Sequence, residues 1–147
     1  MKLIIGNDHK GTKLKNKITS FLKKTGYEVE NVGSNEEIST DYPKYAFEVG
    51  EKISNKTAEF GILICGTGIG MSIAANKVNG VRCALVHNMK EAELARKHND
   101  ANVLALSSNL SFINAKKIVK KFLNTKFSEE ERHINRINLI KDYENNA

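Results

Sequence analysis

The segment GILICGTGIGM, which occupies residues 61–71, decides the fold of this chain. Residues 61–64 form a short apolar run rich in isoleucine, as expected for a strand buried on both faces of a parallel sheet. Three glycines at every second position follow Cys65, and residues 72–77 have the composition of a helix. A glycine loop between a strand and a helix directs backbone N–H groups to one point, and the helix N-terminus adds partial positive charge there. The segment therefore predicts a site for a phosphate or a developing oxyanion.

Cys65 ends the predicted strand, at the edge where open α/β sheets bind ligands. A thiol in this place could act as a base. The alternative is that the glycines only shape a turn and that Cys65 is a small buried apolar residue, as most free cysteines are. This segment alone does not separate the two interpretations. Two nucleotide-binding motifs are excluded, because the dinucleotide fingerprint needs glycine where Met71 stands and the chain has no G-x-x-x-x-G-K-S/T sequence.

Strands and helices alternate along the rest of the chain. Apolar runs predict strands at residues 2–5, 28–32, 60–64, 81–86 and 103–106. Apolar residues at helical spacing predict helices at residues 14–25, 43–53, 72–77, 90–98 and 112–122. This order predicts one α/β domain over residues 1–147, with a five-stranded parallel sheet and helices on both faces.

A further helix is predicted in the tail, residues 128–147. Ser128 followed by Glu131 predicts a capping box at its start. Three isoleucines recur on one side of this helix: Ile134, Ile137 and Ile140. The apolar side can pack on the domain or in a dimer interface.

Arg132 and Arg136 are four residues apart, so their guanidinium groups project from one face of the tail helix. Paired arginines bind a phosphate through bidentate hydrogen bonds better than lysines do. The alternative is a solvated pair beside Glu129 and Glu130.

Composition narrows the class of protein. With 147 residues, 40% of them hydrophobic, the chain can bury a core of its own. The net charge of +6 comes largely from lysines that we assign to solvated helix faces, and the low aromatic content of 7% argues against a nucleic-acid partner. No apolar run spans a membrane, no secretory signal is recognisable, and no histidine–carboxylate cluster suggests a metal. Both cysteines lie in strand-like runs, which indicates a cytoplasmic protein rather than a disulfide framework.

Five separate sequence blocks, in order and nearly from end to end, resemble the B type of ribose-5-phosphate isomerase, in the family that also holds the galactose-6-phosphate isomerase subunits. They are DH at residues 8–9, TDYP at 40–43, CGTGIG at 65–70 with AANK at 74–77, HNDANV at 98–103, and RH at 132–133 with Arg136. The resemblance implies a three-layer Rossmann-like domain. It also implies interconversion of ribose 5-phosphate and ribulose 5-phosphate, without a metal or organic cofactor. The expected assembly is a homodimer or a dimer of dimers whose active sites are shared between subunits.

The resemblance also implies the roles of individual residues. Cys65 would move the proton between C2 and C1 with support from Thr67, and His98 would help open the furanose ring. The backbone amides of Gly66, Gly68, Ile69 and Gly70 would hold the enediolate, supported by Asn99. Asp8 would orient sugar hydroxyls, Tyr42 would line the pocket, and His9, Arg132 and Arg136 would take the phosphate.

The chain departs from some members of this family at two positions. Some members carry a glutamate base where Met71 stands, which leaves Cys65 as the base here. Many carry a phosphate-binding arginine where Asn109 stands. A hexose 6-phosphate such as allose 6-phosphate is an alternative substrate, and a non-catalytic sugar-phosphate-binding subunit is an alternative of another class.

Overall fold

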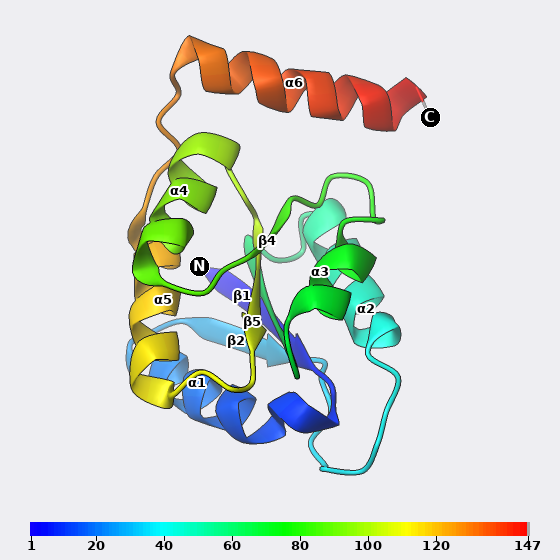
Figure 1. The fold of residues 1–147 in the computed structure, drawn as a ribbon, viewed down its shortest axis with the longest axis vertical. Coiled ribbons are helices and arrows are strands. Elements are labelled where there is room, and N and C mark those ends of the chain that lie inside the picture. The colour runs from blue at the N-terminus through cyan, green and yellow to red at the C-terminus, as the bar shows by residue number, and fades with distance from the viewer. Residues whose placement is uncertain (147) are drawn as a thin grey trace.

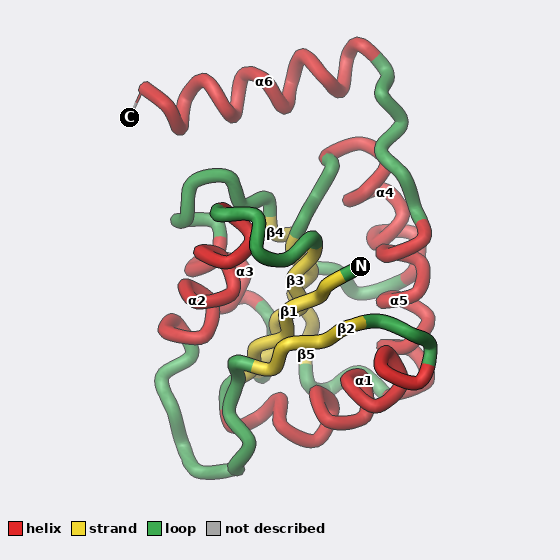
Figure 2. Tube along the Cα trace, turned by 180° about the vertical axis from the view of Figure 1, so that it is seen from behind, coloured by secondary structure: helices red, strands yellow, loops and turns green. Residues whose placement is uncertain are grey.

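A computed structural model describes residues 1–146 and shows five parallel strands in a single sheet (Figures 1 and 2). The strands are β1 (Lys2–Asn7), β2 (Glu28–Asn31), β3 (Phe60–Cys65), β4 (Cys83–Leu85) and β5 (Val103–Ser107). Their order across the sheet is β2-β1-β3-β5-β4. The predicted parallel α/β architecture is confirmed, with β3 at the centre.

Helices cover both faces of this sheet. They are η1 (His9–Gly11, a 3₁₀ turn), α1 (Thr12–Lys24), α2 (Pro43–Ser54), α3 (Ile69–Ala75), α4 (Met89–Asn99), α5 (Phe112–Asn124) and α6 (Glu131–Asn146). One core cluster joins α1, α4 and α5 to the sheet, and the other joins α2 and α3 to its opposite face. Side chains along β3 alternate between the two, because successive residues of a strand point to opposite faces. Ile64 thus lies in the first cluster and Cys65 in the second.

Helix α6 crosses the amino-terminal edge of the sheet, above α4 and the segment that joins α3 to β4 (Figures 1 and 2). Its far end is held where the carboxylate of Glu144 accepts hydrogen bonds from the N–H of Gly80, at 3.2 Å to each oxygen. None of the described helices is long and apolar enough to cross a membrane.

The predicted start of the tail helix is wrong. Helix α6 begins at Glu131, and the hydroxyl of Ser128 accepts from the N–H of Glu130 at 3.3 Å instead of capping the helix. The N–H of Ser128 donates to the carbonyl of Lys97 at 3.1 Å, which ties this segment to the end of α4. Glu129 then turns the chain in a left-handed conformation (φ 59°) before the helix can begin. Ala147, in the predicted range 128–147, lies outside the described residues.

The prediction that the lysines of α1 are all solvated is wrong for Lys15, which has no exposed surface. Its ammonium donates to Oδ1 of Asn35 at 2.6 Å, and burial lowers the pKa of its amino group. The β2–α2 segment (residues 32–42) supplies this cover, twenty residues further along the chain. Helical periodicity alone could not place it there.

Candidate functional site

The thiol of Cys65 lies at the carboxyl end of the central strand and is only 5% exposed. Its Sγ accepts a hydrogen bond from the N–H of Gly68 at 3.2 Å. Gly68 has φ 78°, and a Cβ there would lie 2.6 Å from Cδ1 of Leu85. The loop therefore needs glycine at this position to fold back on the sulfur.

The rest of the glycine loop is held by its own side chains and by β5. The N–H of Ile69 donates to Oγ1 of Thr67 at 3.2 Å. The hydroxyl of Ser107 donates to the carbonyl of Gly66 at 2.8 Å, and the N–H of Ser108 donates to the carbonyl of Cys65 at 2.9 Å. Helix α3 begins at Ile69, three residues earlier than predicted, so Gly70 lies in its first turn. Two of the loop N–H groups that we expected to bind the substrate already donate within the chain: that of Gly68 to Cys65 and that of Ile69 to Thr67.

Asp8 and His9 follow β1, which pairs with β3, so the two strand ends lie side by side. The N–H of Asp8 donates to the carbonyl of Ile64 at 3.2 Å. Asp8 is buried, with 6% of the residue exposed. Nδ1 of His9 accepts from the N–H of Thr40 at 3.2 Å, which leaves Nε2 as the donor of the neutral ring. Asp8 and His9 therefore lie at the same edge of the sheet as Cys65, next to the end of β3.

Tyr42 reaches the glycine loop from the start of α2. A Cβ on Gly70 would lie 2.5 Å from Cζ of Tyr42, so only a glycine lets the ring approach this closely. The ring is partly open to solvent, at 38% exposure for the residue. Cys65, Asp8, His9, Tyr42 and the loop of residues 66–70 thus form one group, which we call the thiol half-site.

The β2–α2 segment that carries Thr40 and Tyr42 is anchored by α1 and β1. The amide of Asn7 donates to the carbonyl of Ser34 at 2.9 Å, and the hydroxyl of Thr12 donates to the carbonyl of Glu36 at 2.9 Å. The ammonium of Lys15 completes these bonds through Asn35.

His98 and Asn99 end α4, which leads into β5, so they lie at the amino-terminal edge of the sheet. The His98 ring stacks on the ring of His133, with centroids 4.4 Å apart and an interplanar angle of 15°. The carbonyl of Asn99 accepts from Nε of Arg82 at 3.0 Å. Together with the start of α6, these residues form a second group, the histidine half-site.

His133 has a place in this group that the sequence interpretation missed. It is 4% exposed, and its Nε2 has no hydrogen-bond partner among the described residues. Burial is the main reason that the pKa of His133 is lowered, and the charges of Arg132 and His98 act in the same direction. Of the three isoleucines predicted on one side of the tail helix, only Ile137 is buried. His133 precedes it by four residues and so lies on the same helix face, a spacing that could have identified it from the sequence. Ile134 and Ile140 are exposed.

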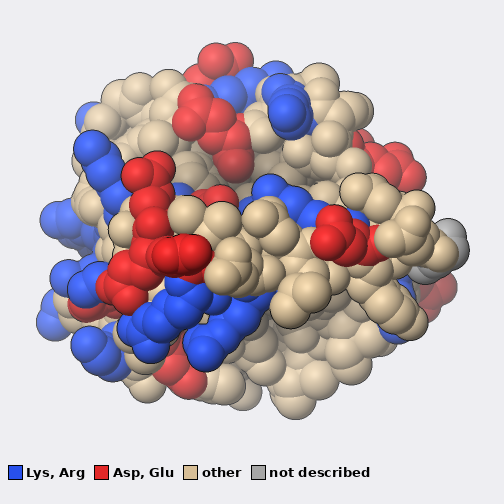
Figure 3. Space-filling view, turned by 90° about the horizontal axis from the view of Figure 1, so that it is seen from above, with Lys and Arg blue, Asp and Glu red and all other residues tan. Residues whose placement is uncertain are grey.

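The two arginines of α6 are exposed. Nε of Arg132 pairs with the carboxylate of Glu130 at 2.9 Å, an interaction that lowers the pKa of Glu130. Arg136 has no ion pair within residues 1–146. In Figure 3, which looks onto the α6 side of the molecule, basic and acidic groups alternate with uncharged surface.

Within one chain, the structure does not bring the two half-sites together. Gly61 pairs with Val103 at one end of the central strands and Cys65 pairs with Ser107 at the other. These ends are about 13 Å apart at the usual rise of a strand residue. His98 precedes Val103 and therefore lies beyond the far end from Cys65.

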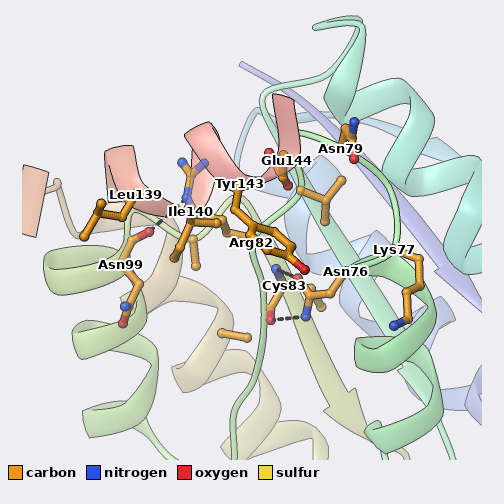
Figure 4. A pocket seen from close by; sticks show the side chains of 13 residues that line it. Asn76, Lys77, Asn79, Arg82, Cys83, Asn99, Leu139, Ile140, Tyr143 and Glu144 are labelled. Carbon is orange, nitrogen blue, oxygen red and sulfur yellow. Dashed lines mark hydrogen bonds between the residues drawn. The ribbon is translucent and has the colours of Figure 1, made fainter. Parts of the chain in front are cut away.

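A cavity of about 900 Å³ lies between α6 and the body of the molecule, away from Cys65 (Figure 4). Its lining includes Asn76, Lys77, Arg82, Cys83, Asn99, Leu139, Ile140, Tyr143 and Glu144. Burial raises the pKa of the Cys83 thiol to about 12, so this cysteine stays protonated near neutral pH. Among residues 1–146, no cluster of His, Cys, Asp and Glu side chains could hold a metal ion.

Comparison with known proteins gives close matches over nearly the whole chain. The family model described as Ribose/Galactose Isomerase matches residues 3–140. The ribose-5-phosphate isomerase B of Escherichia coli (strain K12) is 41% identical over 140 residues, which cover 95% of this chain and 93% of that protein. A putative sugar phosphate isomerase of Bacillus subtilis (strain 168) is 44% identical over 146 residues, with 98% and 97% covered.

Solved structures agree in fold as well as in sequence. The ribose-5-phosphate isomerase B of Clostridium thermocellum has a TM-score of 0.96 and 44% identity, and the match covers 99% of each chain. That of Mycoplasma genitalium, solved with bound ribulose 5-phosphate, has a TM-score of 0.94 and 44% identity, over 99% of this chain and 97% of that one.

Proposed function

The chain belongs to the Ribose/Galactose Isomerase family, and we propose that it interconverts ribose 5-phosphate and ribulose 5-phosphate through an enediolate. The relative from Mycoplasma genitalium, with ribulose 5-phosphate bound, supports this choice of sugar. The observation that carries the reaction type is the Cys65 thiol, which ends the central strand beside Asp8 and accepts the N–H of Gly68.

The proposed proton transfer uses Cys65 as the base. The thiolate removes the proton on C2 of the open-chain aldose, and the electron pair moves through C1–C2 onto the carbonyl oxygen of C1. The same thiol then returns the proton to C1, while the hydroxyl proton on O2 passes to O1 and leaves the C2 ketone. Loop N–H groups and the Thr67 hydroxyl stabilise the oxyanion, because a weak carbon acid needs both a placed base and donors at the developing charge.

We propose that a second copy of the chain completes the site. The partner's copy of His98 would open the sugar ring, and its copy of Asn99 would support the enediolate. Arg132 and Arg136 of the same partner chain would bind the phosphate of the sugar. The distance between the thiol and histidine half-sites supports this arrangement, since the residues of one chain cannot meet. Exposed apolar side chains on α6, notably Leu139 (68%) and Tyr143 (78%), offer a surface for the partner. A two-fold dimer would form two such shared sites.

The decisive experiment is proton exchange at C2 of the sugar. The purified protein is incubated with ribose 5-phosphate in deuterium oxide, and C2 deuteration and ketose formation are followed by NMR. We expect both to occur with the wild-type protein and neither with Cys65→Ala. If the wild-type protein bound ribose 5-phosphate without proton exchange at C2, it would be a non-catalytic sugar-phosphate-binding subunit.

The choice of sugar is tested in the same way. A hexose 6-phosphate such as allose 6-phosphate stays an alternative substrate. A coupled assay over pentose 5-phosphates and hexose 6-phosphates ranks them by kcat/KM, and the proposal requires ribose 5-phosphate to rank first.

A further inference from the structure

Lys10 extends its side chain over Gly66, the first glycine of the glycine loop. It lies on η1, and its N–H donates to Oδ1 of Asp8 at 3.0 Å. A Cβ built on Gly66 would lie 3.1 Å from Cδ of Lys10 and 3.7 Å from Nζ. The ammonium therefore lies next to the backbone of Gly66, and it has no ion pair in the described part of the chain.

On the opposite flank of Gly66, the two residues that approach the loop, Ser107 and Asn109, are uncharged. The hydroxyl of Ser107 links the two sides, because it donates to the carbonyl of Gly66 at 2.8 Å and accepts the N–H of Asn109 at 3.1 Å. Strands β1 and β5 are the two neighbours of β3, so η1 and Asn109 approach the loop from opposite sides. The side chain with an ammonium group beside Gly66 is that of Lys10.

Resting on the isomerase function proposed above, we propose that Lys10 binds the phosphate group of the sugar phosphate. Lys10 directly follows His9; Lys10 is exposed and His9 is partly exposed, whereas Cys65 is buried. An exposed, flexible ammonium suits the phosphate, which is the charged end of the substrate. Lys10 is then a binding residue of the thiol half-site and complements the arginines that the partner would bring.

The test replaces the charge and keeps most of the side-chain length. Lys10→Met should raise KM for ribose 5-phosphate about 10-fold, the low end for a charge-assisted contact. Competitive inhibition by inorganic phosphate should weaken by the same factor, with kcat little changed, because the lost contact binds ground state and transition state alike. Unchanged KM and phosphate inhibition, or a loss in kcat alone, would overturn the proposal.

Lys13→Met is the matched control. Lys13 is exposed and pairs with Glu37 at 3.6 Å, so this variant removes the same charge without touching the loop. It should keep the wild-type KM and phosphate inhibition; an equal loss would mean that only the overall charge matters, and would overturn the assignment to Lys10.

A charge-relocation variant tests the geometry. In Lys10→Met/Asn109→Arg, a guanidinium replaces the lost ammonium on the other flank of Gly66, and we expect phosphate inhibition to recover. No recovery would count against the proposal, since Ser107 links the backbone of residue 109 to Gly66 through two hydrogen bonds.

Titration calorimetry with inorganic phosphate separates this inference from the isomerase proposal. Phosphate binding that depends on Lys10 in a protein without isomerase activity would refute the isomerase function and leave the Lys10 assignment intact. Isomerase activity together with phosphate binding that does not depend on Lys10 would support the isomerase function and refute the Lys10 assignment.

Discussion

Cys65 and Cys83 place the same thiol group in two different surroundings. Cys65 accepts a backbone N–H from a glycine loop at the carboxyl end of β3. Cys83 lies in β4, where burial raises its pKa to about 12. These different surroundings, which the amino-acid type alone does not distinguish, are the reason that we propose Cys65 and not Cys83 as the base.

Cys65→Ala is expected to lower kcat at least about 100-fold, the low end for the loss of an acid–base group, while the substrate still binds. Cys83→Ala is the matched control and should keep near-normal turnover. The measurement is steady-state isomerase kinetics on both variants. Near-normal turnover of Cys65→Ala would mean that another group is the base.

At the scale of elements, α6 contacts α4 through the stack of His133 on His98. Burial lowers the pKa of His133, and the positive charges of Arg132, His98 and Arg136 act in the same direction against the opposing charge of Glu130. The neutral ring is therefore the form that the folded state favours.

This shift predicts a loss of stability in mild acid. As pH falls below about 6.5, the unfolded chain protonates His133 while the folded chain does not, so stability falls until the pH reaches the lowered pKa. His133→Phe keeps an aromatic ring but cannot titrate, and its melting temperature should depend less on pH between 7.5 and 5.5. His87→Phe, which removes an exposed histidine beside Glu91, is the control and should behave like the wild type. Equal pH dependence of all three proteins would contradict the prediction.

The β2–α2 segment is a second element whose position depends on one buried side chain. Lys15→Met removes the bond to Asn35 and also the cost of burying a charge. We expect global stability to be kept, and amide hydrogen exchange at residues 34–36 to become faster because the segment loses an anchor. Lys17→Met, an exposed change on the same helix, is the control. Unchanged exchange in Lys15→Met would show that Asn7 and Thr12 hold the segment alone.

At the scale of the whole molecule, the two half-sites lie at opposite edges of one sheet. This separation predicts complementation between two inactive variants, Cys65→Ala and His98→Ala. In a mixed dimer, the intact Cys65 of one chain would meet the intact His98 of the other. Random pairing of two-fold dimers should restore about a quarter of the wild-type activity, since about half the dimers carry one intact site of two.

The measurement is the coupled assay after the two variants are unfolded and refolded together. Each variant refolded by itself is the control and should stay at its own low activity. Mixtures no more active than the sum of the two would show that Cys65 and His98 do not act in a shared site.

The sequence by itself determined the α/β class, the parallel sheet and the loop that follows Cys65. These depend on local patterns, because apolar runs, glycines and helical spacing specify neighbouring residues. Asp8, His9 and Tyr42 were predicted from the family resemblance instead, and they follow a strand or precede a helix at the carboxyl edge.

Only the tertiary structure decided which residues share an edge and which are covered. His98 and Asn99 precede β5, and each crossover of a parallel sheet carries the chain back to the amino-terminal edge, so their motif lies far from Cys65. Lys15 is buried by a segment twenty residues away. Ser128 does not cap the tail helix as expected, and its N–H donates to the carbonyl of Lys97. Contacts between distant parts of the chain outweigh local preference at these positions, since burial and long-range hydrogen bonds are formed only once the sheet is assembled.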